Sequence, residues 1–286
     1  MSEFLLGPLQ FELTQRALLD VSLLSVACGV LGVLVVLRGL PFLCDALSHC
    51  VVPGVVVAYL TKSSAELWGG GTALLAAWGI ASLTRRGVLG SDPAIAIVFS
   101  GAFAAGLALI SATHSYFADL TEILFGQVLG VTPAEVVVCA VVALVVVGCV
   151  WALYWPLVLI SFDPTAARAQ GLPVERLDLL LYSLLALAVV PGFIAVGSLL
   201  VTALLIVPAA TARLLVRRVS SQMVASAGLA CAACWIGIYV SFNSHVGTGG
   251  AIVLASGLLF TIALLASPRD GLLARLRHRT TSPVPA

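Results

Sequence analysis

The chain has 286 residues, of which 61% are hydrophobic and only 9% are charged, and its mean hydropathy is +1.15. A soluble domain carries about 25% charged residues, so this composition excludes a soluble globular protein and indicates a polytopic membrane protein. The seven cysteines fall mostly within apolar runs, where they behave as small hydrophobic residues, and no disulfide framework is indicated.

Apolar runs of about 20 residues recur along the chain, each long enough to cross a bilayer as a helix. Residues 1–16 are predicted to form an interfacial segment, residues 17–268 the transmembrane permease domain and residues 269–286 a basic cytoplasmic tail. The N-terminus lacks a cationic region and a cleavage site, so no signal peptide is expected. The predicted fold class is an all-α bundle of eight or nine spans at 17–37, 42–60, 67–83, 93–112, 134–155, 178–193, 196–214, 222–241 and 249–266.

Two features refine this assignment. Residues 113–133 are too polar and too rich in glycine for a full span, and we expect a half-helix or re-entrant element there. Pro191 and Gly192 are predicted to end the sixth span, and Pro208 to kink the seventh. If either 17–37 or 113–133 is assigned differently, the count of spans is eight.

The basic residues predict the orientation. Alternating spans place twelve of the 14 Lys and Arg residues on one side, and only Arg16 and Lys62 on the other. By the positive-inside rule the larger group faces the cytoplasm, and so does the tail.

The stretch from Cys44 to Gly54 places a carboxylate and an imidazole inside an apolar run. Asp45 and His49 are four residues apart, so on a helix they share one face. Ionisable residues at membrane depth cost about 2.5–3.5 kcal/mol and usually face a cavity or a partner. Because Pro53 cannot donate to the carbonyl of His49, that oxygen is expected to be free. These groups predict a site for a divalent transition metal; the alternative is a hydrogen-bonded Asp–His pair that only ties helices together.

A second well-defined stretch lies on the predicted cytoplasmic side. Asp163 can cap a helix, Pro164 suits its first position, Ala166 and Ala167 favour helix, and Gly171 suits its end. The sequence therefore predicts a short cytoplasmic helix over residues 163–171.

Other polar residues support weaker hypotheses. His114 and His245 lie near outer ends of spans and could guide ions inward, although an interfacial polar role is the favoured interpretation of each. Cys44 and Cys50 project about 100° and 140° from Asp45 on a helix, so we expect them to be packing residues. The Cys231/Cys234 pair has redox or metal spacing but stands alone in an apolar run, and packing is again expected.

Three stretches together resemble the membrane permease subunits of metal-type ABC importers, the family that takes up zinc or manganese. They are the segment from Arg38 through Asp45-Ala-Leu-Ser-His49 to Pro53-Gly54, the segment Asp163–Gly171, and the segment Val196–Ala212. The flanking Cys44 and Cys50 depart from the small residues usual in the family.

The resemblance implies an alternating-access permease in the inner membrane of a prokaryotic cell, in which Asp45 and His49 contact the transported zinc or manganese ion. It implies a homodimer or a pair with a related permease, cytoplasmic ATP-binding subunits and an extracytoplasmic metal-binding protein. Asp163, Pro164, Ala166, Ala167 and Gly171 would form the helix that couples to the ATPase. No permanent cofactor and no nucleic-acid partner are expected; membrane lipid surrounds the chain.

The residues agree with a transport subunit that is not itself an enzyme. A Walker A motif needs Gly-Lys, and the single lysine of the chain, Lys62, follows Thr61. Other classes remain open: a secondary transporter or cation channel, an ABC permease for a metal chelate, or a membrane metalloenzyme. The last lacks a His-Glu-x-x-His motif and a second cluster that could supply a general base.

Overall fold

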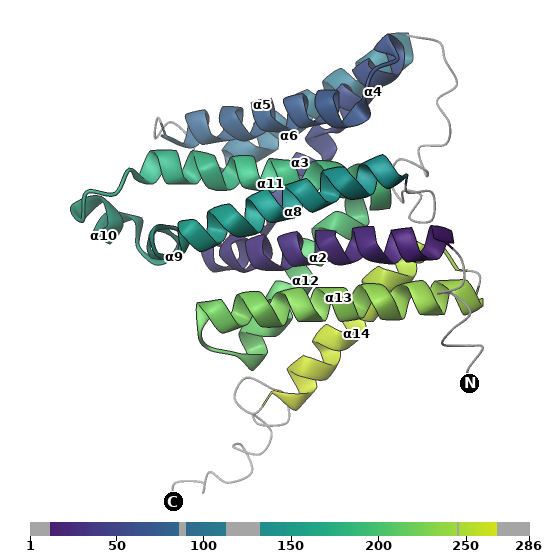
Figure 1. The fold of residues 1–286 in the computed structure, drawn as a ribbon. Helices are drawn as coiled ribbons and strands as arrows, with labels where there is room; N and C mark the ends of the chain where they lie inside the picture. The colour runs from purple at the N-terminus through teal and green to yellow at the C-terminus, as the bar shows by residue number, and fades with distance from the viewer. Residues whose placement is uncertain (1–11, 86–89, 113–131, 245, 268–286) are drawn as a thin grey trace, which may run out of the picture.

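The computed structural model describes residues 12–85, 90–112, 132–244 and 246–267, and within them the regular secondary structure is entirely α-helical (Figure 1). This confirms the predicted all-α fold class. In chain order the helices are α2 (Glu12–Arg38), α3 (Pro41–Cys50), α4 (Val52–Thr61), α5 (Ala65–Arg85), α6 (Ser91–Ala112), α8 (Pro133–Ala152), α9 (Tyr154–Phe162), α10 (Pro164–Ala169), α11 (Val174–Val196), α12 (Ser198–Leu215), α13 (Val219–Ser244) and α14 (Thr248–Ala266).

Eight stretches of the described chain are long and apolar enough to cross a membrane, with α3 and α4 counted together as one. They correspond to eight of the nine predicted spans, and the protein is a multi-pass membrane protein. The remaining predicted span, 67–83, is third in chain order and corresponds to helix α5. This helix is long enough to cross a membrane, but it contains Glu66 and three consecutive glycines and is not among the eight.

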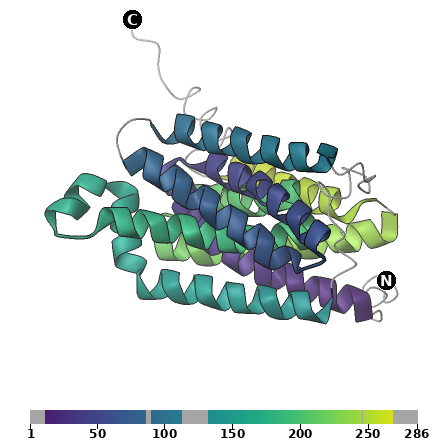
Figure 2. The same cartoon turned by 90° about the horizontal axis from the view of Figure 1, so that it is seen from above.

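The helices run side by side as one bundle (Figures 1 and 2). Helix α2 lies inside it and packs against α8, α12 and α13, while α4, α5 and α6 form a layer on one side. Small residues permit the closest approaches, as is usual between membrane helices. Gly32 of α2, for example, lies directly against the backbone of α12 at Leu205.

Burial divides the helices into inner and outer ones. In the most apolar 18-residue stretch of α2 and of α11, 67% of the stretch is buried, compared with 17% in α6 and 22% in α8. Apart from Asp92 at the start of α6, the exposed side chains of α6 and α8 are apolar or small, so these faces suit lipid or another membrane helix rather than water.

The charged ends of the helices agree with the predicted orientation. Arg38 and Arg85 end α2 and α5, and Arg176 begins α11, all at the end of the bundle from which α10 protrudes (Figure 1). Arg16 and Lys62 lie at the opposite end, at the start of α2 and the end of α4. The protruding end is therefore the cytoplasmic one.

Several boundaries differ from the prediction. Helix α2 already begins at Glu12, and the predicted span 134–155 is divided at Leu153 into α8 and α9. The prediction that Pro191 ends a span was wrong, because α11 continues through it to Val196. The chain turns instead at Gly197, whose backbone has φ 85° and ψ 164°. The tail 269–286 and most of the 113–133 segment lie outside the described residues.

Candidate functional site

Helix α3 carries the predicted pair. Pro41 occupies its first turn, and the helix brings Asp45 and His49 onto one face one turn apart. The Nε2 atom of His49 lies 3.8 Å from Oδ1 of Asp45. This distance is too long for a direct hydrogen bond, although it lies within the 4.0 Å range of an ion pair.

The spacing of the two atoms suits one shared cation. Nitrogen and oxygen ligands lie about 2.0–2.2 Å from ions such as zinc, so two donors of one ion can be separated by at most about 4.4 Å. The side chains of His49 and Asp45 are 19% and 38% exposed, whereas Cys44, Leu47 and Cys50 on the same helix are fully buried. The pair alone on α3 therefore combines metal-binding atoms with an open face.

Two phenylalanines lie against the imidazole, and a third extends the aromatic cluster. The ring of His49 lies 5.6 Å from Phe99 and 5.6 Å from Phe103, both on α6, and Phe99 also makes an edge contact with Phe42 at 6.4 Å. These rings restrict the orientation of the imidazole and exclude water from one side of it. Their position beside His49 was not predicted from the sequence, although the i, i+4 spacing of Phe99 and Phe103 already placed them on one helix face.

The helix is interrupted directly after the pair. Val51 separates α3 from α4, Pro53 lies in the first turn of α4, and Gly106 of α6 packs closely against the Pro53 nitrogen. The expectation of a free His49 carbonyl was wrong: the N–H of Val51 is directed at that oxygen. The backbone turn itself provides the partner that proline removes.

Sulfur contributes nothing to this face. Cys44 and Cys50 are fully buried in the hydrophobic core, as the helical angles predicted. Cys234 contacts the hydroxyl of Ser25 at 3.2 Å and Cys231 the carbonyl of Ser22 at 3.7 Å, so both have packing and hydrogen-bonding roles. Among the described residues no three His, Cys, Asp or Glu side chains gather closely enough to enclose a metal. This one chain thus offers an open, two-donor face.

The predicted cytoplasmic helix is present as α10, and it protrudes from the bundle between α9 and α11 (Figures 1 and 2). Oδ1 of Asp163 accepts hydrogen bonds from the N–H groups of Thr165 and Ala166, both at 2.9 Å, and Pro164 follows as the first helical residue. Gly171 ends the turn with φ 78°. Ala167 is buried, whereas Ala166 is partly exposed.

Two further predicted residues, His114 and His245, lie outside the described residues, so their proposed guidance of ions stays a prediction.

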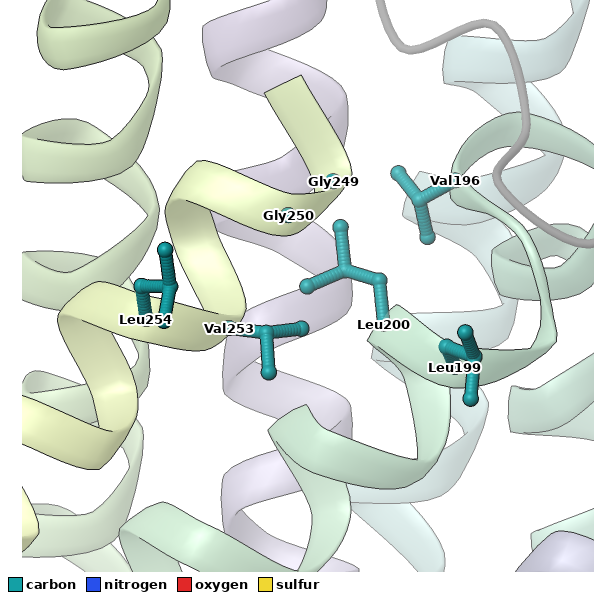
Figure 3. A pocket seen from close by; sticks show the side chains of 7 residues that line it. All are labelled: Val196, Leu199, Leu200, Gly249, Gly250, Val253 and Leu254. Atoms are coloured by element: carbon teal, nitrogen blue, oxygen red, sulfur yellow. The ribbon is translucent and has the colours of Figure 1, made fainter. Parts of the chain in front are cut away.

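A pocket of about 320 Å³ lies between the start of α12 and the start of α14 (Figure 3). It is lined only by Val196, Leu199, Leu200, Gly249, Gly250, Val253 and Leu254. Because these side chains offer no ligand atom, the pocket is not a metal site.

Comparison with known proteins gives consistent matches over almost the whole chain. The profile of the ABC 3 transport family matches residues 10–267. The manganese transport system membrane protein MntC of Listeria monocytogenes is 37% identical over 270 residues, covering 94% of this chain and 96% of that protein. The manganese import system permease protein ScaB of Streptococcus gordonii is 33% identical over 275 residues, with 96% and 99% covered.

The fold has a counterpart among solved structures. A chain of PsaBC from Streptococcus pneumoniae, solved in complex with a Fab, superimposes with a TM-score of 0.84 at 32% identity. The match covers 96% of this chain and 99% of that one. The similarity therefore includes the helix with Asp45 and His49 as well as the α9–α10 protrusion.

Proposed function

Because the chain belongs to the ABC 3 transport family, we propose that it is the permease subunit of an ATP-driven importer of manganese ions, in which Asp45 and His49 contact the ion during passage. The resemblance that three sequence motifs indicated is thereby confirmed at the level of the family. Beyond the family, we propose manganese as the metal, ATP as the energy source and Asp45 and His49 as the contacts of the ion. The observation that supports this most is the arrangement of the two side chains on one face of α3.

The donor set is compatible with manganese and argues against a metal that requires thiolates. A carboxylate oxygen suits manganese and an imidazole nitrogen suits several transition metals including zinc, whereas thiolates would favour copper(I) or zinc. The thiols nearest to the site in sequence, Cys44 and Cys50, are buried away from the open face. Two relatives that match more than nine-tenths of this chain are named as manganese transport proteins, which agrees with this choice.

The openness of the site suits transport rather than storage. A transported ion must be bound and then released, so a few ligands are preferable to a closed cage. Two donors leave most positions of a six-coordinate ion to water or to a second permease copy. We therefore propose that Asp45 and His49 face the passage between two such subunits, and that an extracytoplasmic metal-binding protein delivers the ion.

Energy would reach the site through contact, because the chain has no Walker A lysine. Helix α10 is the well-capped element on the cytoplasmic side, and it would lie against a groove of an ATP-binding subunit. A secondary transporter would have no use for this protrusion. Loss of uptake on removing the ATP-binding subunits therefore separates the two classes.

Uptake of radioactive Mn²⁺ by the assembled complex in liposomes tests the site. Asp45→Ala and His49→Ala are each expected to abolish uptake while leaving assembly intact. Asp92→Ala, which removes an exposed carboxylate at the start of α6, is the matched control and should leave uptake unchanged. Normal uptake by either site variant would exclude the proposed site, and preferential uptake of Zn²⁺ in a competition assay would exclude manganese as the cargo.

A further inference from the structure

A buried arginine connects the α10 protrusion to the helix that carries the metal pair. Arg38 is the last residue of α2, and its side chain is only 8% exposed. Its Nε donates to the hydroxyl of Ser161 at 3.1 Å, and its Nη1 donates to Oδ1 of Asp178 at 2.5 Å. A single guanidinium therefore binds two segments that lie more than a hundred residues further along the chain.

The two partners are the two stems of the protrusion. Ser161 belongs to α9 and lies two residues before Asp163, the residue that caps α10. Asp178 lies in the second turn of α11, where the chain has re-entered the bundle. Because the guanidinium is planar and presents its donors at fixed angles, neither stem can shift relative to Arg38 without losing a hydrogen bond to a buried charge.

On its other side Arg38 adjoins the start of α3. The chain turns at Gly39, which has φ 68°, and the N–H of Leu40 bonds back to the carbonyl of Val35 at 3.1 Å. Helix α3 begins at Pro41, so about 6 Å of helix separates its first residue from Asp45. The path from Arg38 to Asp45 is therefore short: it consists of the turn at Gly39 and Leu40 and the first turn of α3.

We propose that Arg38 is the positioning residue that transmits movement of the α10 protrusion to α3 by holding both stems to the end of α2. The proposal rests on the proposed function, since it assumes that α10 receives movement from an ATPase. The remaining nitrogen of Arg38, Nη2, is buried and has no hydrogen-bond partner among the described residues, so an acceptor brought to it by a shift of either stem would be stabilised there.

The test measures Mn²⁺ uptake and ATP hydrolysis on the same liposomes containing the assembled complex. Coupling free energies between sites correspond to about 5–150-fold effects, and we expect Arg38→Gln to lower the ions moved per ATP by a factor in that range. ATP hydrolysis should stay within about twofold of the wild type, because the proposal leaves the ATPase intact. A purely structural role would lower both activities together.

Two variants refine the result. Arg38→Lys keeps the positive charge but loses the planar guanidinium with its fixed donor angles. This variant should therefore also move fewer ions per ATP than the wild type. Arg218→Gln removes an exposed arginine from the loop between α12 and α13 on the same side of the membrane. This control variant should leave the number of ions moved per ATP unchanged. An unaltered ratio in Arg38→Gln, or full coupling in Arg38→Lys, would overturn the proposal.

A milder change covers the case in which Arg38→Gln fails to assemble. Ser161→Ala removes the acceptor on α9 and leaves the ion pair with Asp178 in place. We expect a smaller loss of coupling, with normal yield of the complex. If Ser161→Ala instead transports with the wild-type ratio, the two stems are not held through Arg38 and the proposal fails.

A readout without cargo separates this inference from the proposed function. Pro41 is exposed at the start of α3, and a Pro41→Cys variant of the complex in nanodiscs can be labelled with a maleimide. ATP with vanadate should change the labelling rate when Arg38 is present and leave it unchanged in Arg38→Gln. This result would hold even if wild-type liposomes took up no Mn²⁺, whereas equal changes in both backgrounds would refute the role of Arg38.

Discussion

Replacing Gly32 by alanine would test the closest helix approach found at the glycines that the structure describes. A Cβ atom at this position would lie 1.9 Å from the carbonyl oxygen of Leu205 and 3.3 Å from the Cβ of Ala209, both on α12. Ordinary contact requires about 3.4 Å, so α2 and α12 would have to separate by about 1.5 Å. The obstructing atom belongs to the backbone, so no change of side-chain rotamer can relieve the overlap.

The cost follows from two opposing effects. Overpacking of a close contact costs about 1–3 kcal/mol, and a clash with backbone falls at the upper end of that range. Alanine is better than glycine inside a helix by about 1 kcal/mol, which offsets part of the loss. The expected net destabilisation of Gly32→Ala is therefore about 2 kcal/mol, or about 4–8 °C in the midpoint of thermal unfolding.

Gly228 on α13 provides the matched control, since a Cβ there would meet no atom within 4 Å. Gly228→Ala should be neutral or stabilising by up to about 1 kcal/mol. Thermal unfolding of the purified chain in detergent, followed by size-exclusion chromatography, measures both variants. If Gly32→Ala unfolds at the same temperature as Gly228→Ala, the close approach of α2 and α12 described here is incorrect.

Three further outcomes are expected. Asp163→Ala removes the N-cap of α10 at a cost of about 0.5–2 kcal/mol, so less ATP-binding subunit should co-purify with the permease. If Asp163→Asn and Asp163→Ala recover the same amount of ATP-binding subunit, the cap is not what matters for this contact. Gly197→Ala places a side chain at φ 85° and ψ 164°, a backbone region almost restricted to glycine, so its unfolding midpoint should fall by the equivalent of about 1–3 kcal/mol. Because an imidazole must be neutral to bind metal, Mn²⁺ uptake should decline on acidification while ATP hydrolysis is followed in parallel; uptake that is insensitive to acid would argue against His49 as a ligand.

The features that were predicted correctly depend on short stretches of sequence. Asp45 and His49 share a face because they are four residues apart on a helix, and no distant residue is needed to make that true. Helix α10 carries its own cap, its own first-turn proline and its own terminal glycine within nine residues. Eight spans followed from apolar length alone, since a bilayer sets the required length.

The features that were missed depend on packing between distant segments. Phe99 lies beside His49 only because α6 packs on α3, and Arg38 meets its partners across 123 and 140 positions of sequence. The continuation of α11 through Pro191 has the same origin. That turn of the helix is fully buried, and the side chain of Val201 packs so closely against Gly192 that a Cβ there would lie 2.6 Å away. Neighbouring helices thus stabilise a backbone that proline alone would interrupt.

The interruption at Val51 divides one membrane crossing into two parts with different neighbours. The inner half, α3, packs against α11 and α12 as well as α6, whereas the outer half, α4, packs chiefly against α5 and α6. Because Phe99 and Phe103 of α6 lie against the imidazole of His49, a tilt of the layer formed by α4, α5 and α6 would also move the rings beside the residue that receives the ion. Entry of the ion and its coordination would then be mechanically coupled, so variants that hold this layer closed should also bind manganese supplied from the cytoplasmic side more weakly.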